Sequence, residues 1–426
     1  MIVNVGDRVR ITHGPHAYEG ILMPLEGALK ETYVSLKLDN GYNVGFSRDD
    51  VSIELLSEGR SFNATMPEVD IPYNEDLPDV AILGTGGTVA SKIDYMTGAV
   101  YPAFSPEELL QLVPELAKIA NIEGKEILSI VSEDITFSDW KGIGREVVRQ
   151  YERGCDGIVV THGTDTLHFT SSMLSFMLHN LPHPLVLVGA QRSSDRPSSD
   201  AALNLISAVN FAGTDCREIT VCMHADMNDD YCYVHRGTRV RKFHTSRRDA
   251  FTTINGRPLA KVPGSGPIEY LSAYRRGSNP KEDLSLDTGL EERVALVKTY
   301  PTASDIVAHL VDKGYRGIIL EGSGLGHTPH TLHEEIRRGV EEGVVFGMTS
   351  QCVHGRVNMN VYRDGRILKE MGVIPLGDML AETAWCKLSW VLGHASDYED
   401  VRSEMLRDVA GELDPVSRID AYNVCR

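Results

Sequence analysis

The chain has 426 residues, of which 42% are hydrophobic, and carries a formal net charge of −18 at pH 7. This length suggests two or three domains, and the hydrophobic content is typical of a globular protein with a sizeable core. The charge argues against a free-standing nucleic-acid binder, because affinity for the backbone depends on basic groups that displace counterions. We therefore expect any contacts with nucleic acid to lie mostly on another chain.

Targeting and redox signals point to a reduced cytoplasm. The apolar runs are too short for a transmembrane helix, and the start MIVNVGDRVR has no basic region followed by an apolar region, so neither a membrane span nor a signal peptide is expected. The seven cysteines are scattered without a CxxC pair, which favours free thiols over disulfides or zinc.

Residues 1–56 alternate apolar and polar side chains with a period of two, and Asn40-Gly41 is a hairpin signal. Four or five short strands without a helix predict a small SH3-like β-barrel domain. The segment has five Lys/Arg against eight Asp/Glu, which favours a docking or stabilising role over nucleic-acid binding. Residues 57–78 carry three prolines and no apolar periodicity, so we expect an extended linker.

The stretch DVAILGTGGTVAS at 79–91 is an apolar strand that ends in a glycine-rich turn. Three glycines let the backbone bring bare N–H groups close to a ligand, and Thr88 follows at the carboxyl end of the strand. A dinucleotide-binding fingerprint would need Gly or Ala at Val89, and the Gly-Lys-Ser/Thr ending of a P-loop is missing. A second strand, IVVTHGTDT at 158–166, ends in another hydroxyl-rich turn. The pair indicates a hydroxyl nucleophile beside an oxyanion hole.

Strands and helices alternate from residue 79 onward, which predicts a mostly parallel sheet with helices on both faces. The pattern places a strand at 126–131, helices at about 139–153 and 165–179, and further strands at PLVLVGA and EITVCM. Residues 263–292 have the composition of a connection, and the alternation restarts at Val294. We therefore predict an N-terminal α/β domain at 79–290, carrying the catalytic residues, and a smaller α/β domain at 291–426.

Several motifs carry a resemblance to a known family. GTGGTVAS and THGTDT are followed by RKFHTS at 241–246, EGSGLG at 321–326, TSQC at 349–352 and GVIPLGDMLAETAWCKLSWVLG at 372–393. Over about residues 79–395 the chain resembles the bacterial-type L-asparaginases. With its N-terminal segment, the whole chain resembles the D-subunit family of archaeal glutamyl-tRNA(Gln) amidotransferases. The resemblance implies an asparaginase-like fold of two doubly wound parallel sheets after the barrel.

The resemblance also implies the catalytic residues. Thr88 is the expected nucleophile, and Thr164, Asp165 and Lys242 form the second catalytic set. Tyr95 in YMTGAV matches the family's loop tyrosine better than Tyr101 does. Because RGTRVRKFHTSRR at 236–248 holds six basic residues and no acid, Arg239, Arg241 and Arg247 are expected to favour the neutral amine of Lys242, while Asp165 opposes this.

Substrate contacts are implied in the same way. Ser132 matches the serine that holds the substrate α-carboxylate, Asp165 the group that grips the α-ammonium, and Gly87 belongs to the nucleophile turn. Glu133 stands where the common asparaginases have Gln, which adds a carboxylate near the ammonium. His327, His330 and His333 in HTPHTLH, and the acids of HADMNDD at 224–230, are interpreted as solvated or polar segments rather than metal ligands.

The expected activity is therefore that of a glutaminase with a threonine nucleophile, whose ammonia goes to the E subunit of the amidotransferase for the conversion of Glu-tRNA(Gln) to Gln-tRNA(Gln). No metal or cofactor is expected in this chain, since ATP and Mg²⁺ would be used by the partner. A homodimer core within a heterotetramer is implied, with tRNA held mainly by the partner and no membrane contact. The alternatives are a free-standing L-asparaginase with an accessory barrel and a non-catalytic scaffold. Residues 92–104 are expected to form a lid that carries Tyr95.

Overall fold

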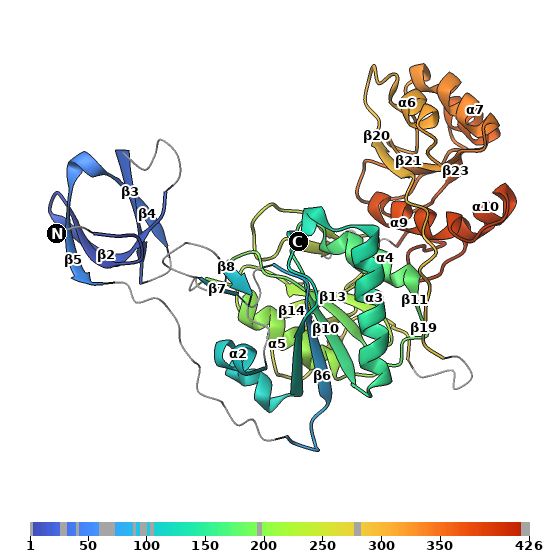
Figure 1. Ribbon diagram of the computed structural model, residues 1–426. Helices are drawn as coiled ribbons and strands as arrows, with labels where there is room; N and C mark the ends of the chain where they lie inside the picture. The colour runs from blue at the N-terminus through green and yellow to red at the C-terminus, as the bar shows by residue number, and fades with distance from the viewer. Residues whose placement is uncertain are drawn as a thin grey trace.

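The computed structural model describes residues 3–25, 32–39, 42–58, 73–87, 91–93, 100–102, 106–193, 198–276 and 283–418. Figure 1 shows three regions: an all-β region in blue and two α/β lobes, which we call the N-lobe and the C-lobe. None of the described helices is both long and apolar enough to cross a membrane. The six cysteines in these ranges are free thiols.

The N-terminal region is an antiparallel sheet of five strands in the order β4-β3-β2-β1-β5. Its strands are β1 (Arg8–His13), β2 (His16–Met23), β3 (Tyr33–Leu38), β4 (Asn43–Ser47) and β5 (Val51–Ser57). Alternate side chains are buried on one face, as the period of two predicts, and form a separate small core with Val9, Ile11 and Phe46. The predicted Asn40-Gly41 turn lies outside the described residues, although β3 and β4 on either side of it do pair.

The N-lobe is built on an eight-stranded sheet in the order β18-β17-β14-β13-β12-β10-β6-β9. Five neighbouring strands are parallel: β9 (Asn121–Glu126), β6 (Asp79–Gly84), β10 (Gly157–Thr161), β12 (Leu185–Val188) and β13 (Ile219–His224). Three antiparallel strands extend one edge: β14 (Cys232–Arg236), β17 (Ala260–Val262) and β18 (Glu269–Tyr270). Short antiparallel pairs lie outside this sheet: β7 (Ser91–Ile93) pairs with β8 (Val100–Pro102), and β15 (Val240–Lys242) pairs with β16 (Phe251–Thr253).

Helices cover both faces of this sheet (Figure 1). One core joins Leu83 and Val160 to α3 (Phe137–Glu152) and α4 (Leu167–Met177). The other joins Ile82 and Val159 to α2 (Pro106–Leu112) and α5 (Ala201–Ala212). Because successive side chains on a strand point to opposite faces, the apolar runs of β6 and β10 supply both cores.

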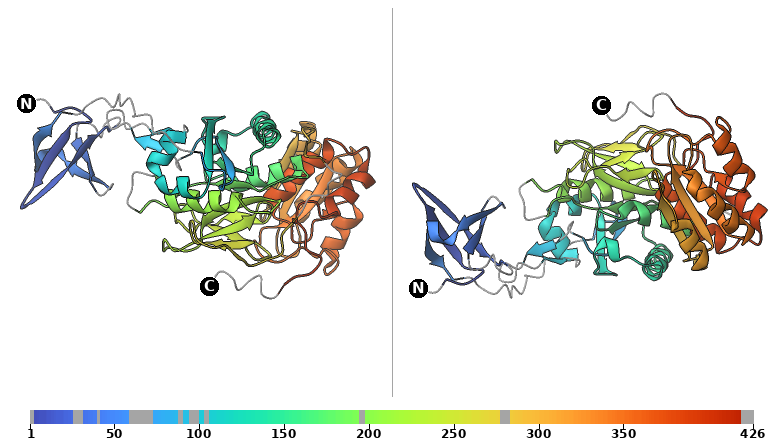
Figure 2. Two further views of the ribbon diagram at one scale, coloured as in Figure 1. Left: turned by 90° about the horizontal axis from the view of Figure 1, so that it is seen from below. Right: turned by 90° about the horizontal axis from the view of Figure 1, so that it is seen from above.

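The C-lobe carries a parallel sheet in the order β20-β21-β22-β23. Its strands are β20 (Val294–Lys298), β21 (Gly317–Gly322), β22 (Val345–Ser350) and β23 (Ile374–Pro375), and its helices are α6 (Ile306–Asp312), α7 (His333–Glu341), α8 (Arg363–Glu370), α9 (Ala381–Leu392) and α10 (Tyr398–Leu406). Helix α9 lies between this sheet and α4 of the N-lobe, and one continuous core contains side chains of both lobes (Figures 1 and 2). The predicted α/β fold class is confirmed, with an antiparallel sheet at the position of the predicted barrel.

One sequence-based assignment is wrong, and one is incomplete. The strand predicted at 126–131 is β9 at Asn121–Glu126; after it, the N–H groups of Ile127 and Leu128 both donate to the carbonyl of Gly84. The strand is an edge strand with half-exposed polar residues, so the apolar run that drew the prediction is the segment after it. The predicted connection at 263–292 also contributes strands, namely β18 and β19 (Ser285–Leu286), the latter paired with β11 (Leu178–His179).

Candidate active site at the carboxyl ends of β6 and β10

The strand order of the parallel sheet changes direction at β6, next to β10. In chain order, β9 adds on one side of β6, and β10, β12 and β13 add on the other. Open α/β sheets bind ligands outside the carboxyl ends of the strands at such a switch point. The two signature turns leave the sheet here, because β6 ends at Gly84 and β10 ends at Thr161.

The glycine-rich turn after β6 is locked against the turn after β10. The N–H and the hydroxyl of Thr85 both donate to the carbonyl of Thr161, at 3.1 and 2.9 Å. Gly86 and Gly87 have φ values of +117° and +84°, which side-chain-bearing residues rarely adopt. A Cβ on Gly87 would lie 2.9 Å from the nitrogen of Gly163, so this backbone approach requires glycine. Thr88 follows directly but lies outside the described residues.

Lys242 links the second signature turn to the hairpin formed by β15 and β16. Its Nζ donates to Thr164 Oγ1 at 2.9 Å and to Asp165 Oδ1 at 2.8 Å. The Lys242 side chain is only 9% exposed, whereas that of Asp165 is 69% exposed. The structure thus brings three of the predicted residues into direct contact. A neutral amine at this position could accept the hydroxyl proton of Thr164, and Asp165 is open to a cationic ligand.

The expected excess of positive charge around Lys242 is not present. Arg239 pairs with Asp378 at 2.7 Å, Arg241 with Glu382 at 3.0 Å, and Arg247 with Asp249 at 2.7 Å. Two of these carboxylates come from the C-lobe, so the local sequence around Lys242 did not reveal them. The premise of three unpaired arginines beside Lys242 is therefore not met in the structure.

Ser132 lies against the turn after β10. It is buried, its hydroxyl donates to Glu133 Oε2 at 3.4 Å, and its carbonyl accepts from the hydroxyl of Thr166 at 2.5 Å. A Cβ on Gly163 would lie 2.7 Å from the Cβ of Ser132. Ser132 and Glu133 therefore belong to the same loop cluster as Thr164 and Asp165. Tyr95 lies outside the described residues, and only the backbone of Tyr101 is described, in β8.

His162 is a supporting residue that the sequence analysis did not single out. His162 Nδ1 donates to the carbonyl of Gly163 at 2.7 Å, since a carbonyl can only accept. Nε2 of the neutral ring therefore accepts from the hydroxyl of Thr170 at 2.9 Å, and Thr170 Oγ1 accepts from Trp140 Nε1 at 2.9 Å. Burial lowers the pKa of His162 to about 4, so the ring stays neutral and holds the signature turn in place.

Acid should weaken the fold in a defined pH window. Burial lowers the pKa of His162 to about 4 and those of His168 and His235 to about 3. An unfolded chain protonates histidine near pH 6.5, so below this pH the unfolded state binds more protons and the free energy of unfolding falls. We expect urea midpoints to fall steadily from pH 6.5 to pH 5. His235→Gln should flatten this slope, and His330→Gln, which replaces an exposed histidine, should not. A constant midpoint over this window would contradict the expectation.

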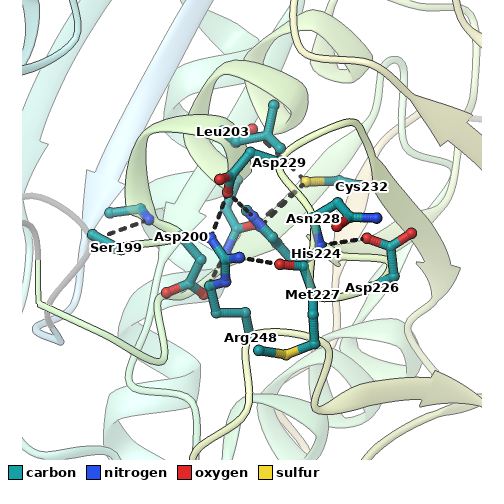
Figure 3. A network of polar contacts seen from close by, with 12 residues as sticks. Ser199, Asp200, Leu203, His224, Asp226, Met227, Asn228, Asp229, Cys232 and Arg248 are labelled. Atoms are coloured by element: carbon teal, nitrogen blue, oxygen red, sulfur yellow. Dashed lines mark hydrogen bonds and ion pairs between the residues drawn. The ribbon is translucent and has the colours of Figure 1, made fainter. Parts of the chain in front are cut away.

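The loop after Lys242 is anchored by a polar network, shown in Figure 3. Arg248, buried at the end of this loop, donates to Asp229 Oδ1 at 2.5 Å and to the carbonyl of Met227. Asp229 also contacts His224 Nε2 at 3.1 Å, and Asp226 accepts from the N–H of Asn228. Asp226 and Asp229 of HADMNDD therefore serve as structural acceptors.

The histidines of HTPHTLH, interpreted as a solvated segment because no carboxylate or thiol pattern completes a metal site, contact other rings and one acid. His327 packs against Tyr362 with 5.4 Å between ring centroids. His330 and His333 stack at 4.9 Å between ring centroids, and His330 Nε2 lies 3.2 Å from Asp364 Oδ2. Within the described ranges, no group of three or more His, Cys, Asp or Glu side chains has the geometry to hold a metal ion.

Comparisons with known proteins divide the chain into three matched ranges. Residues 3–56 match the GatD N-terminal domain, residues 79–274 the asparaginase N-terminal domain, and residues 293–405 the glutaminase/asparaginase C-terminal domain. Among solved structures, the thermostable L-asparaginase from Thermococcus kodakarensis is similar, with 36% identity and a TM-score of 0.71. This similarity covers 79% of the present chain and 100% of that asparaginase. L-asparaginase I from Vibrio cholerae is 28% identical with a TM-score of 0.69, and the similarity covers 79% of the present chain and 99% of the Vibrio enzyme.

Other relatives match nearly the whole chain, including its N-terminal β region. The D subunit of the glutamyl-tRNA(Gln) amidotransferase of Pyrococcus abyssi is 52% identical over 99% of this chain and 97% of its own length. The protein of the same name from Methanothermobacter thermautotrophicus is 49% identical over 96% of this chain and 94% of its own length. The chain belongs to the family of glutamyl-tRNA(Gln) amidotransferase D subunits, which joins a small β domain to an asparaginase-like fold.

Proposed function

We propose that this chain is the glutaminase component of a tRNA-dependent amidotransferase, releasing ammonia from glutamine for the conversion of Glu-tRNA(Gln) to Gln-tRNA(Gln). The observation that carries the proposal is the contact of Lys242 with Thr164 and Asp165, in a chain whose full length matches amidotransferase D subunits. Residues 3–56 match the GatD N-terminal domain, and the alternative of a free-standing asparaginase gives this domain no role.

The proposed chemistry is an acyl transfer through a threonine. Thr88 Oγ attacks the side-chain amide carbon, its proton passes through a base to the amide nitrogen, and the C–N bond breaks to release ammonia and leave an acyl ester. Water then hydrolyses the ester to glutamate, with Thr164 and Lys242 handling protons and N–H groups of the glycine turn stabilising the oxyanion. Asp165 and Glu133, both acidic at the rim of the cluster, suit the α-ammonium of the substrate, and Ser132 its α-carboxylate. Tyr95 would serve as a second proton-handling group.

A partner chain is needed for the second half of the reaction. We propose the E subunit of the amidotransferase as this partner, with ATP and Mg²⁺ bound there and with two D subunits forming the core of a heterotetramer. The name shared by the relatives indicates one component of a larger enzyme, and the net charge of −18 fits a division in which the partner holds most of the tRNA.

Ammonia release tests the proposal. The rate should be measured with glutamine and with asparagine, for the chain alone, for the chain with its partner, and for that complex with Glu-tRNA(Gln). We expect glutamine to be preferred and its hydrolysis to rise about a hundredfold in the full complex, which requires a coupling free energy of about 3 kcal/mol. Equal rates in all three states, with asparagine preferred, would instead support the free-standing asparaginase.

A further inference from the structure

The strand that carries Lys242 pairs with β16 in the N-lobe and is also tied to the C-lobe of the same chain. Side chains on β15 alternate between two directions, as in any strand. Lys242 faces Thr164 and Asp165 of the N-lobe, while the flanking Arg241 reaches the C-lobe carboxylate of Glu382, with 3.0 Å between Nη2 and Oε1. Just before the strand, the hydroxyl of Thr238 donates to the carbonyl of Ala410, also in the C-lobe.

Glu382 stands where both catalytic segments meet. It lies in the first turn of α9, where the helix dipole favours a carboxylate. Its Oε1 is also 4.0 Å from Nε2 of His168, three residues after Asp165 in the chain. The side chain is buried, and its other oxygen, Oε2, makes no hydrogen bond within the described part of the chain. A buried carboxylate with one free oxygen is costly unless its charge is compensated, and Arg241 supplies that compensation.

The other charged groups around Glu382 leave Arg241 as its principal partner. Burial, Arg241 and Lys242 lower the pKa of His168 to about 3, so this ring is neutral. Burial and Glu382 raise the pKa of Glu321 at the end of β21, whereas Lys298 of β20 and Arg241 oppose that shift. Lys242 and Asp165 are the other N-lobe charges that act on the neighbouring His168.

We infer that Glu382 is a positioning residue for Lys242: by pairing with Arg241 it fixes β15 and cancels the positive charge beside the catalytic amine. This inference deepens the proposed function and rests on glutamine hydrolysis through Lys242. The carboxylate belongs to the C-lobe, so the second lobe completes the electrostatics of a site whose other described groups are in the N-lobe.

The test uses two substitutions that change the charge beside Lys242 in opposite directions. Glu382→Gln keeps an oxygen for Arg241 but leaves the guanidinium charge uncancelled, which favours the neutral amine. The acid limb of the pH profile of kcat for glutamine hydrolysis should then move about half a pH unit downward. Arg241→Gln removes the cation and leaves Glu382 uncancelled, so the same limb should move upward. Glu382→Asp restores the charge and should return the limb toward its original pH.

The matched control is Glu218→Gln. Glu218 is a buried N-lobe carboxylate that pairs with Arg236 at 2.6 Å, away from the Arg241–Glu382 pair. This control should lower stability comparably and leave the pH limb in place. Arg241→Gln, which alters a partly exposed side chain, carries the test if Glu382→Gln does not fold. Unshifted limbs, or shifts in the same direction for Glu382→Gln and Arg241→Gln, would overturn the inference. Glutamine hydrolysis that survives Lys242→Ala would instead refute the proposed function of this lysine, and the inference with it.

Discussion

Lys242→Ala should reduce glutamine hydrolysis by the complex about a thousandfold or more, while the protein stays folded. The amine is the one described group that contacts both Thr164 and Asp165, and loss of a positioned proton-transfer group costs roughly 10² to 10⁴ in rate. Ammonia release under saturating glutamine measures this loss. Thr88→Ala, which removes the expected nucleophile, should have an effect at least as large.

Two controls separate lost chemistry from lost structure. Lys118→Ala, which removes an exposed lysine remote from the site, should leave hydrolysis unchanged. Ammonium chloride supplied to the Lys242→Ala complex should still support amidation of Glu-tRNA(Gln), since only the release of ammonia is lost. Near-normal hydrolysis by Lys242→Ala would refute its role, and failure of amidation with external ammonium would point to damage of the complex instead.

Lys387→Met should destabilise the protein by about 3–5 kcal/mol, because it removes one partner of a fully buried ion pair. The side chains of Lys387 and Glu412 are both 0% exposed, and Nζ donates to Glu412 Oε1 and to the carbonyl of Arg407, each at 2.5 Å. Burial lowers the pKa of Lys387 even though Glu412 favours its charged form, which shows how strongly this site depends on the pairing. Denaturant unfolding measures the loss.

A double variant distinguishes a stranded charge from lost packing. Glu412→Gln keeps an acceptor for the N–H groups of Val409 and Ala410, which the carboxylate now binds, but removes the negative charge. Lys387→Met combined with Glu412→Gln should therefore be more stable than Lys387→Met alone. Lys369→Met, at an exposed position, should change stability by less than about 0.5 kcal/mol. An unchanged free energy of unfolding for Lys387→Met would show that the pair contributes nothing.

The parts of the fold that could be predicted are those with strong local patterns. The apolar runs at Val80–Leu83 and Ile158–Val160 are fully buried central strands, so their composition identifies them. Their turns meet because parallel neighbours end at the same edge of a sheet. β9 was misplaced because an edge strand needs no continuous apolar run, and NIEGKE offers none.

The parts that could not be predicted depend on contacts between distant segments. Lys242 was identified only through the family resemblance, since a three-residue strand has no periodicity of its own. The carboxylates that neutralise Arg239 and Arg241 are Asp378 and Glu382, which lie in the other lobe and far along the chain. The role of His162 as a neutral support follows from burial and from its bond to Thr170, which a sequence motif does not express.

The continuous core shared by α4 and α9 determines how this enzyme can be regulated. Enzymes that close around a ligand by hinge bending need an interface between lobes that opens at little cost. Here α4 begins at Leu167, just after Thr164 and Asp165, and packs on α9 through side chains of one buried core. Separating the lobes would expose that core and pull Glu382 away from Arg241. The catalytic framework is therefore preorganised when the chain folds, and we expect a partner chain to act on surface loops rather than on the angle between the lobes.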